Sequence, residues 1–118
     1  MSSRPAAARE ILAAERIEAI AAITALAREF DGIVDAAYAV ATDDEHDPEG
    51  ATIAFERAQV AALLERARGR LADIDRALAR IAEGGYGTCE RCGQPIAAGR
   101  LAARPAARTC IGCATAPG

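Results

Sequence analysis

Apolar residues recur at helical spacing through the first third of the chain. Between about Ala6 and about Ala41 the sequence contains no proline and only one glycine, Gly32. The apolar positions alternate steps of three and four residues, which is the spacing of the a and d positions of a coiled coil. These positions are Ile20, Ile23, Ala27, Phe30, Val34, Ala37 and Ala41, and the stripe is widened by Leu12, Ile17, Ile33 and Val40. The pattern predicts one long helix.

A second apolar stripe begins after a charged interruption. Residues 42–51 carry acids, a proline and a glycine in place of apolar periodicity, so they predict a connecting tip. Thr52 is a plausible N-cap for the next helix, with Gly50 and Asp47 as alternatives. The helix should stop at Gly84-Gly85, and an interior Gly69 should cost it about 1 kcal/mol relative to alanine. Its stripe consists of Ile53, Val60, Leu64, Ala67, Leu71, Ile74, Leu78 and Ile81.

The two predicted helices form a hairpin. Each has roughly 30 to 38 residues, or about 45 to 55 Å at 1.5 Å per residue. Because the connection between them is short, they should lie antiparallel. The fold class that we expect is therefore mainly α: a long antiparallel two-helix coiled-coil hairpin over residues 1–83, with an acidic tip at 42–51, followed by a small module over residues 84–118.

That small module contains all four cysteines of the chain, in two Cys-x-x-Cys pairs seventeen residues apart. This spacing is typical of a four-thiolate zinc site, in which two tight turns aim four sulfurs at one ion about 2.3 Å away. Gly93 and Gly112 beside the pairs suit such turns. Because four thiolates leave no position for water, the zinc should be structural. The predicted ligands of this single Zn²⁺ are Cys89, Cys92, Cys110 and Cys113.

Other uses of four cysteines are two disulfides, a redox pair or an iron–sulfur cluster. Zinc is favoured because the N-terminus lacks the apolar core of a secretory signal, and disulfides are rare in reducing compartments. No apolar run approaches the roughly 18 residues of a membrane span. A module of about 30 residues also has too little core to fold without its metal. We therefore expect a cytoplasmic C4-type zinc finger with no membrane partner.

Composition and charge narrow the function. The chain of 118 residues is rich in alanine, has no tryptophan, and carries a net charge of -3. Its acidic residues lie mainly in the first 83 residues, and the remainder is mildly basic. An acidic hairpin argues against wholesale nucleic-acid binding, which needs a basic face. No Ser/His/Asp constellation, phosphate-binding glycine loop or open metal position indicates an enzyme.

The finger carries a specific family pattern. Residues 85–96 read GYGTCERCGQPI, residues 100–105 read RLAARP, and the second cysteine pair follows. This run closely resembles the zinc finger of the DksA/TraR family, and a helical hairpin precedes the finger in that family too. The resemblance implies a regulator that binds bacterial RNA polymerase and inserts the hairpin into the secondary channel, without reading DNA sequence. It also implies that the acidic tip acts on the polymerase through some of Asp43, Asp44, Glu45, Asp47 and Glu49.

Two other function classes stay open. Long seams of this kind can pair between chains, so the protein could be a structural or oligomerising zinc-capped coiled coil, although we favour a monomer. A DNA- or RNA-binding zinc finger is less favoured, because the finger offers only Tyr86 for stacking. The basic residues of the finger could contact a partner or simply be solubilising charge; they are Arg91, Arg100, Arg104 and Arg108.

Overall fold

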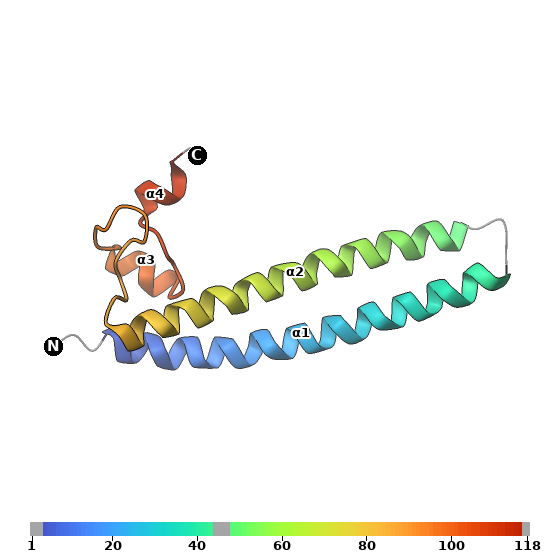
Figure 1. Ribbon diagram of the computed structural model, residues 1–118, viewed down its shortest axis with the longest axis horizontal. Helices are drawn as coiled ribbons and strands as arrows, with labels where there is room; N and C mark the ends of the chain where they lie inside the picture. The colour runs from blue at the N-terminus through green and yellow to red at the C-terminus, as the bar shows by residue number, and fades with distance from the viewer. Residues whose placement is uncertain (1–3, 44–47, 117–118) are drawn as a thin grey trace. The chain divides into compact units, whose positions relative to one another are not determined.

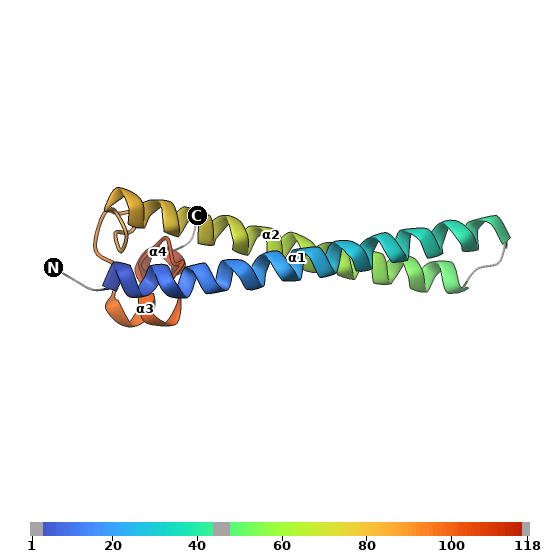
Figure 2. The same cartoon turned by 90° about the horizontal axis from the view of Figure 1, so that it is seen from below.

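The computed structural model describes residues 4–43 and 48–116, and side chains over 4–39 and 50–116. Within these ranges there is no β-strand, and the chain forms two long and two short helices. They are α1 (Arg4–Asp43), α2 (Pro48–Glu83), α3 (Ala98–Ala103) and α4 (Ile111–Thr115). Both views show α2 running back along α1 (Figures 1 and 2). The predicted fold class, a long helical hairpin followed by a four-cysteine module, is confirmed.

The start of α2 differs from the prediction. The helix begins at Pro48, so Gly50 and Thr52 lie inside it and are not its N-cap. Proline suits the first helical position because its missing N–H needs no partner there. The third candidate for the cap, Asp47, lies outside the described residues. The helices therefore extend into the predicted tip from both sides.

The end of α2 is where the glycines predict it. The last helical residue is Glu83, and Gly84 follows with φ +85°. This is the left-handed conformation that a glycine adopts at low cost after a helix. The backbone N–H of Gly85 then donates to the carbonyl of Arg80 at 2.9 Å. This turn carries the chain from the hairpin into the cysteine module.

The described chain packs as two compact units. The first unit consists of Met1–Glu18 and Arg70–Gly118, and the second of Ala19–Gly69. The start of α1 and the end of α2 thus belong to the unit that contains the cysteines. None of the described helices is long and apolar enough to cross a membrane.

The second predicted seam is confirmed, because each of its eight residues is buried or half-buried. The first seam is confirmed only in part. Ile17 is 71% exposed, Ile20 and Val34 are each 39% exposed, and Ala19 is buried instead. Alanine occupies many positions of α1, and its small side chain lets α2 pack closely against it. The buried face of α1 therefore includes alanines and cannot be identified from the large apolar residues alone. Ala41 and Val40 fall outside the described side chains.

Candidate metal centre

The first cysteine pair lies on a tight turn after α2. Gly87 and Gly93 have φ of +90° and +77°, which glycine adopts without strain. Between them, an isolated bridge pairs Thr88 with Pro95, and the backbone N–H of Cys89 donates to Gln94 at 2.8 Å. The turn is closed by the N–H of Gly93, which donates to the carbonyl of Cys89 at 3.0 Å. Local backbone geometry therefore folds this pair into a knuckle.

The second pair is carried by a helix start. Cys110 directly precedes α4, and Cys113 lies within it. The N–H of Ala114 donates to the carbonyl of Cys110 at 2.9 Å, which closes the first helical turn around the pair. Gly112 lies in this helix and has no positive φ, so, unlike Gly93, it does not supply a left-handed turn beside its cysteine pair.

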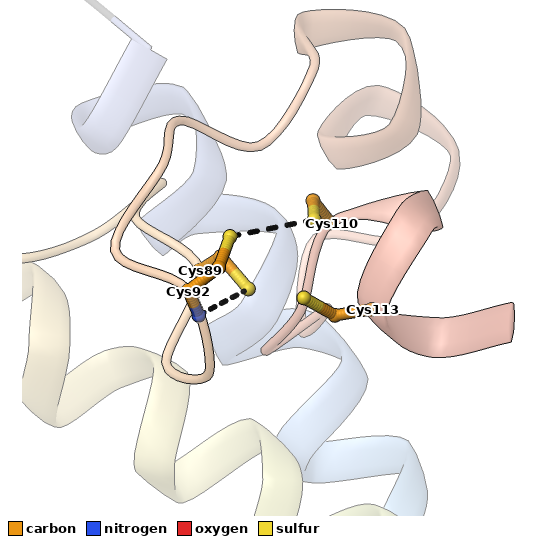
Figure 3. A group of neighbouring side chains, drawn as sticks. All are labelled: Cys89, Cys92, Cys110 and Cys113. Carbon is orange, nitrogen blue, oxygen red and sulfur yellow. Dashed lines mark hydrogen bonds between the residues drawn. The ribbon is translucent and has the colours of Figure 1, made fainter. Parts of the chain in front are cut away.

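The four thiols gather at one point (Figure 3). Their sulfur atoms all lie within 4.8 Å of one another, and the Sγ atoms of Cys92 and Cys110 are 3.8 Å apart. A tetrahedral zinc with bonds of about 2.3 Å needs sulfurs about 3.8 Å apart. The Cys92–Cys110 pair has this spacing, and the whole cluster is compact enough for its four thiols to share one ion. All four cysteines are free. Among the described residues, no other group of three or more His, Cys, Asp or Glu side chains could hold a metal.

Hydrogen bonding gives the thiols of this cluster different pKa values. Backbone hydrogen bonds, chiefly at Cys110 and then at Cys92, favour the thiolate and lower the pKa of Cys89 to about 6. Side-chain hydrogen bonding with Cys110, followed by burial and the other thiols, raises the pKa of Cys113 to about 12. Four crowded sulfurs cannot all carry negative charge without a cation. A divalent metal that displaces their protons would satisfy the whole cluster.

The apolar core of the module is small. Its buried members are Cys89, Ile96 and Leu101, against which Tyr86 and Ala107 pack. The hydroxyl of Tyr86 also donates to the carbonyl of Pro105 at 2.9 Å, which ties the loop after α2 to the segment after α3. One cysteine thus belongs both to the candidate ligand set and to the core. Folding of the module and binding of its metal are consequently linked.

Most of the predicted contact arginines bind within the module. Nε of Arg100 donates to the carbonyl of Thr109 at 2.8 Å, and Nη1 of Arg91 to that of Cys113 at 3.3 Å. Arg108 pairs with Glu90 and Asp73. In the described part of the chain, the side chain of Arg104 forms no hydrogen bond or ion pair. Sequence analysis missed Glu90, although it is the only acidic residue after residue 83.

The predicted tip residues are only partly within the described chain. Asp44, Glu45 and Asp47 lie outside the described residues. Asp43 is the last residue of α1 and Glu49 is in the first turn of α2, but their side chains are not among those described. Their role at the tip stays a prediction.

Several known proteins resemble this chain in the zinc finger region. The family model described as "Prokaryotic dksA/traR C4-type zinc finger" matches residues 84–116. The RNA polymerase-binding transcription factor DksA of Caulobacter vibrioides is 49% identical over 43 residues, which are 36% of this chain and 30% of that protein. An uncharacterized protein of Aquifex aeolicus is 52% identical over 44 residues, 37% of this chain and 30% of that protein. The chain therefore matches less than a third of the length of these relatives.

A solved structure extends the likeness to the hairpin. The structure of transcription factor DksA2 from Pseudomonas aeruginosa matches with a TM-score of 0.76 and 30% sequence identity. The match covers 96% of this chain and 81% of that one. The clustered thiols and the matched finger are those of a protein with one structural zinc ion. With both hairpin and finger matched, the chain belongs to the DksA/TraR family of C4-type zinc finger proteins.

Proposed function

We propose that this protein is a zinc-containing transcription regulator that binds bacterial RNA polymerase in the cytoplasm. The observation that carries the proposal is the likeness to DksA2, which covers hairpin and finger together at 30% identity. A relative with a matching finger is itself an RNA polymerase-binding transcription factor. Under this proposal residues 1–83 are the inserting hairpin and residues 84–118 the finger, whose zinc is held by Cys89, Cys92, Cys110 and Cys113.

The hairpin would act through its tip. It inserts residues 42–51 into the secondary channel of the polymerase, where clustered carboxylates can perturb a bound Mg²⁺ or compete for basic side chains. The family pattern at the tip is Asp-x-x-Asp-x-Ala. Asp44 and Asp47 supply its two aspartates, whereas Glu49 stands where the pattern has alanine. The finger itself reads no DNA sequence. In support, three of its four arginines are bonded within the first unit, which leaves a sparse basic surface for phosphates.

Retention of core RNA polymerase tests this function directly. The zinc-loaded protein serves as bait, and a variant lacking residues 42–51 serves as the control, with zinc content measured on both samples. We expect the intact protein to retain polymerase and the shortened hairpin to retain much less, because the tip contacts are lost while the finger is unchanged. If neither protein retains polymerase although both contain zinc, the proposal is wrong.

One observation favours a second candidate, a structural or oligomerising zinc-capped coiled coil. Within the second unit, Tyr38 is 76% exposed on α1 and Phe55 is 70% exposed on α2. Large apolar side chains in this position suit a protein partner, including a second copy of the chain. Light scattering on the bait distinguishes the two candidates, since the oligomerising function requires a mass above that of a monomer.

A further inference from the structure

Glu90 lies between two of the candidate zinc ligands and faces three arginines. Its Oε1 is 3.0 Å from Nε of Arg76 and 3.6 Å from Nη1 of Arg80, both on α2. Its Oε2 is 3.0 Å from Nε of Arg108, which precedes the second cysteine pair by two residues. One carboxylate therefore joins the helix to both halves of the finger.

Other bonds reinforce the same junction. The guanidinium of Arg80 also donates to the carbonyls of Gly85 and Thr88, at 2.8 and 3.0 Å. Arg108 reaches Asp73 on α2 at 3.4 Å. The backbone N–H of Glu90 donates to the carbonyl of Arg108 at 2.9 Å, so the two arms of the finger are joined by main chain as well as by charge. The loop, the helix and both cysteine pairs meet at this point.

The charges make Glu90 the critical member of the network. Its side chain is only 21% exposed. Among the described residues, the only other acid that pairs with any of the three arginines is Asp73, which pairs with Arg108. An isolated surface ion pair contributes little, but a shared and partly desolvated acceptor contributes through several pairs at once. Without the Glu90 carboxylate, Arg76 and Arg80 on α2 would face Arg108 of the finger with only Asp73 to offset their charge. No other acid in residues 84–118 can replace it.

We propose that Glu90 is the positioning residue that fixes the zinc finger against the end of α2. The knuckle that presents Cys89 and Cys92 thereby also presents the carboxylate that holds the finger in place. The inference goes beyond polymerase binding, and its test requires no polymerase.

The test compares Glu90→Gln with Glu83→Gln in the full, zinc-loaded protein. Glu83 is exposed at the end of α2 and has no ion pair in the described structure, so its variant matches the change in charge. Zinc content is measured first, and hydrogen exchange is then followed by NMR at the amides of Gly85 and residue 90. We expect full zinc content in both variants and exchange about tenfold faster in Glu90→Gln alone, since several pairs are lost together.

Substitution of an arginine shows whether the effect passes through the network. Arg76→Gln should accelerate exchange in the wild-type background but add little in the Glu90→Gln background, because residues that act together are not additive. Exchange that is unchanged in Glu90→Gln would overturn the proposal. Loss of zinc from Glu90→Gln would overturn it as well, because Glu90 would then support the metal site itself and not the attachment of the finger.

Discussion

At the scale of single residues, the cysteines were predictable and their neighbours were not. Two Cys-x-x-Cys pairs specify a cluster through covalent spacing alone, because each tight turn brings its own two sulfurs together. The roles of Arg108 and Glu90 depend instead on partners in α2 that are up to 35 residues away in sequence. Nothing local distinguishes such an arginine from a solubilising one. The contacts appear only when the finger is packed against the helix.

Cys89 gives the clearest prediction for a single residue. Its sulfur belongs to the metal cluster, and its side chain is 2% exposed in the core of the finger. Cys89→Ser should therefore lower zinc content from about one ion per chain to nearly none, and it should unfold the finger. Elemental analysis measures the zinc, and the NMR amide spectrum of residues 84–116 reports the fold.

The matched control is Ala114→Ser, which adds a hydroxyl at an exposed position of α4 beside Cys113. This variant should keep its zinc and its amide spectrum. A Cys89→Ser protein that retains full zinc would contradict the proposed ligand set, because three thiolates and a serine would then suffice.

At the scale of elements, the two long helices were predicted unequally well. The α2 seam is marked by branched aliphatic residues at almost every core position, so its direction is unambiguous. In α1 the core positions Ala8 and Ala19 are indistinguishable from the many exposed alanines around them. Apolar residues spaced three and four positions apart can therefore be found on more than one face of α1, and the sequence does not decide which face is buried. The start of α2 differs from the prediction because a proline such as Pro48 suits a turn and a first helical position equally well.

Gly69 tests the cost of glycine inside α2. A Cβ added there meets nothing within 4 Å, and the residue has no positive φ. Gly69→Ala should therefore raise the free energy of unfolding by about 0.5 to 1 kcal/mol, because alanine loses less backbone entropy in a helix. Urea denaturation of the zinc-loaded protein, followed by circular dichroism, measures the change.

Gly93→Ala is the opposing control. Gly93 has φ +77°, so a side chain there is strained although nothing lies within 4 Å of its Cβ position. The strain costs roughly 1 to 2 kcal/mol, and it should destabilise the knuckle that carries Cys89 and Cys92. A Gly69→Ala protein no more stable than wild type would show that α2 is not a regular, unstrained helix at this point.

At the scale of the whole molecule, hairpin and finger could each be predicted because each has its own periodic or covalent signal. Their packing could not, because the first unit joins Met1–Glu18 to Arg70–Gly118 through contacts between distant segments. The domain boundary between residues 83 and 84 stays a prediction. The function could be predicted only from the family pattern of the finger, because neither helix periodicity nor four thiolates identify a binding partner.

The acidic tip provides the prediction that belongs to the whole molecule, because its effect requires both binding and insertion. Asp44→Asn combined with Asp47→Asn preserves side-chain shape and removes two charges. If the carboxylates act at the polymerase active site, transcription from sensitive promoters should change, while polymerase retention and zinc content stay close to wild type. Asp31→Asn combined with Asp35→Asn removes the same charge from exposed positions of α1 and should leave transcription unaltered. Equal effects of the two pairs would mean that net charge matters and the tip does not, whereas an effect of the tip pair alone would identify the carboxylates that act.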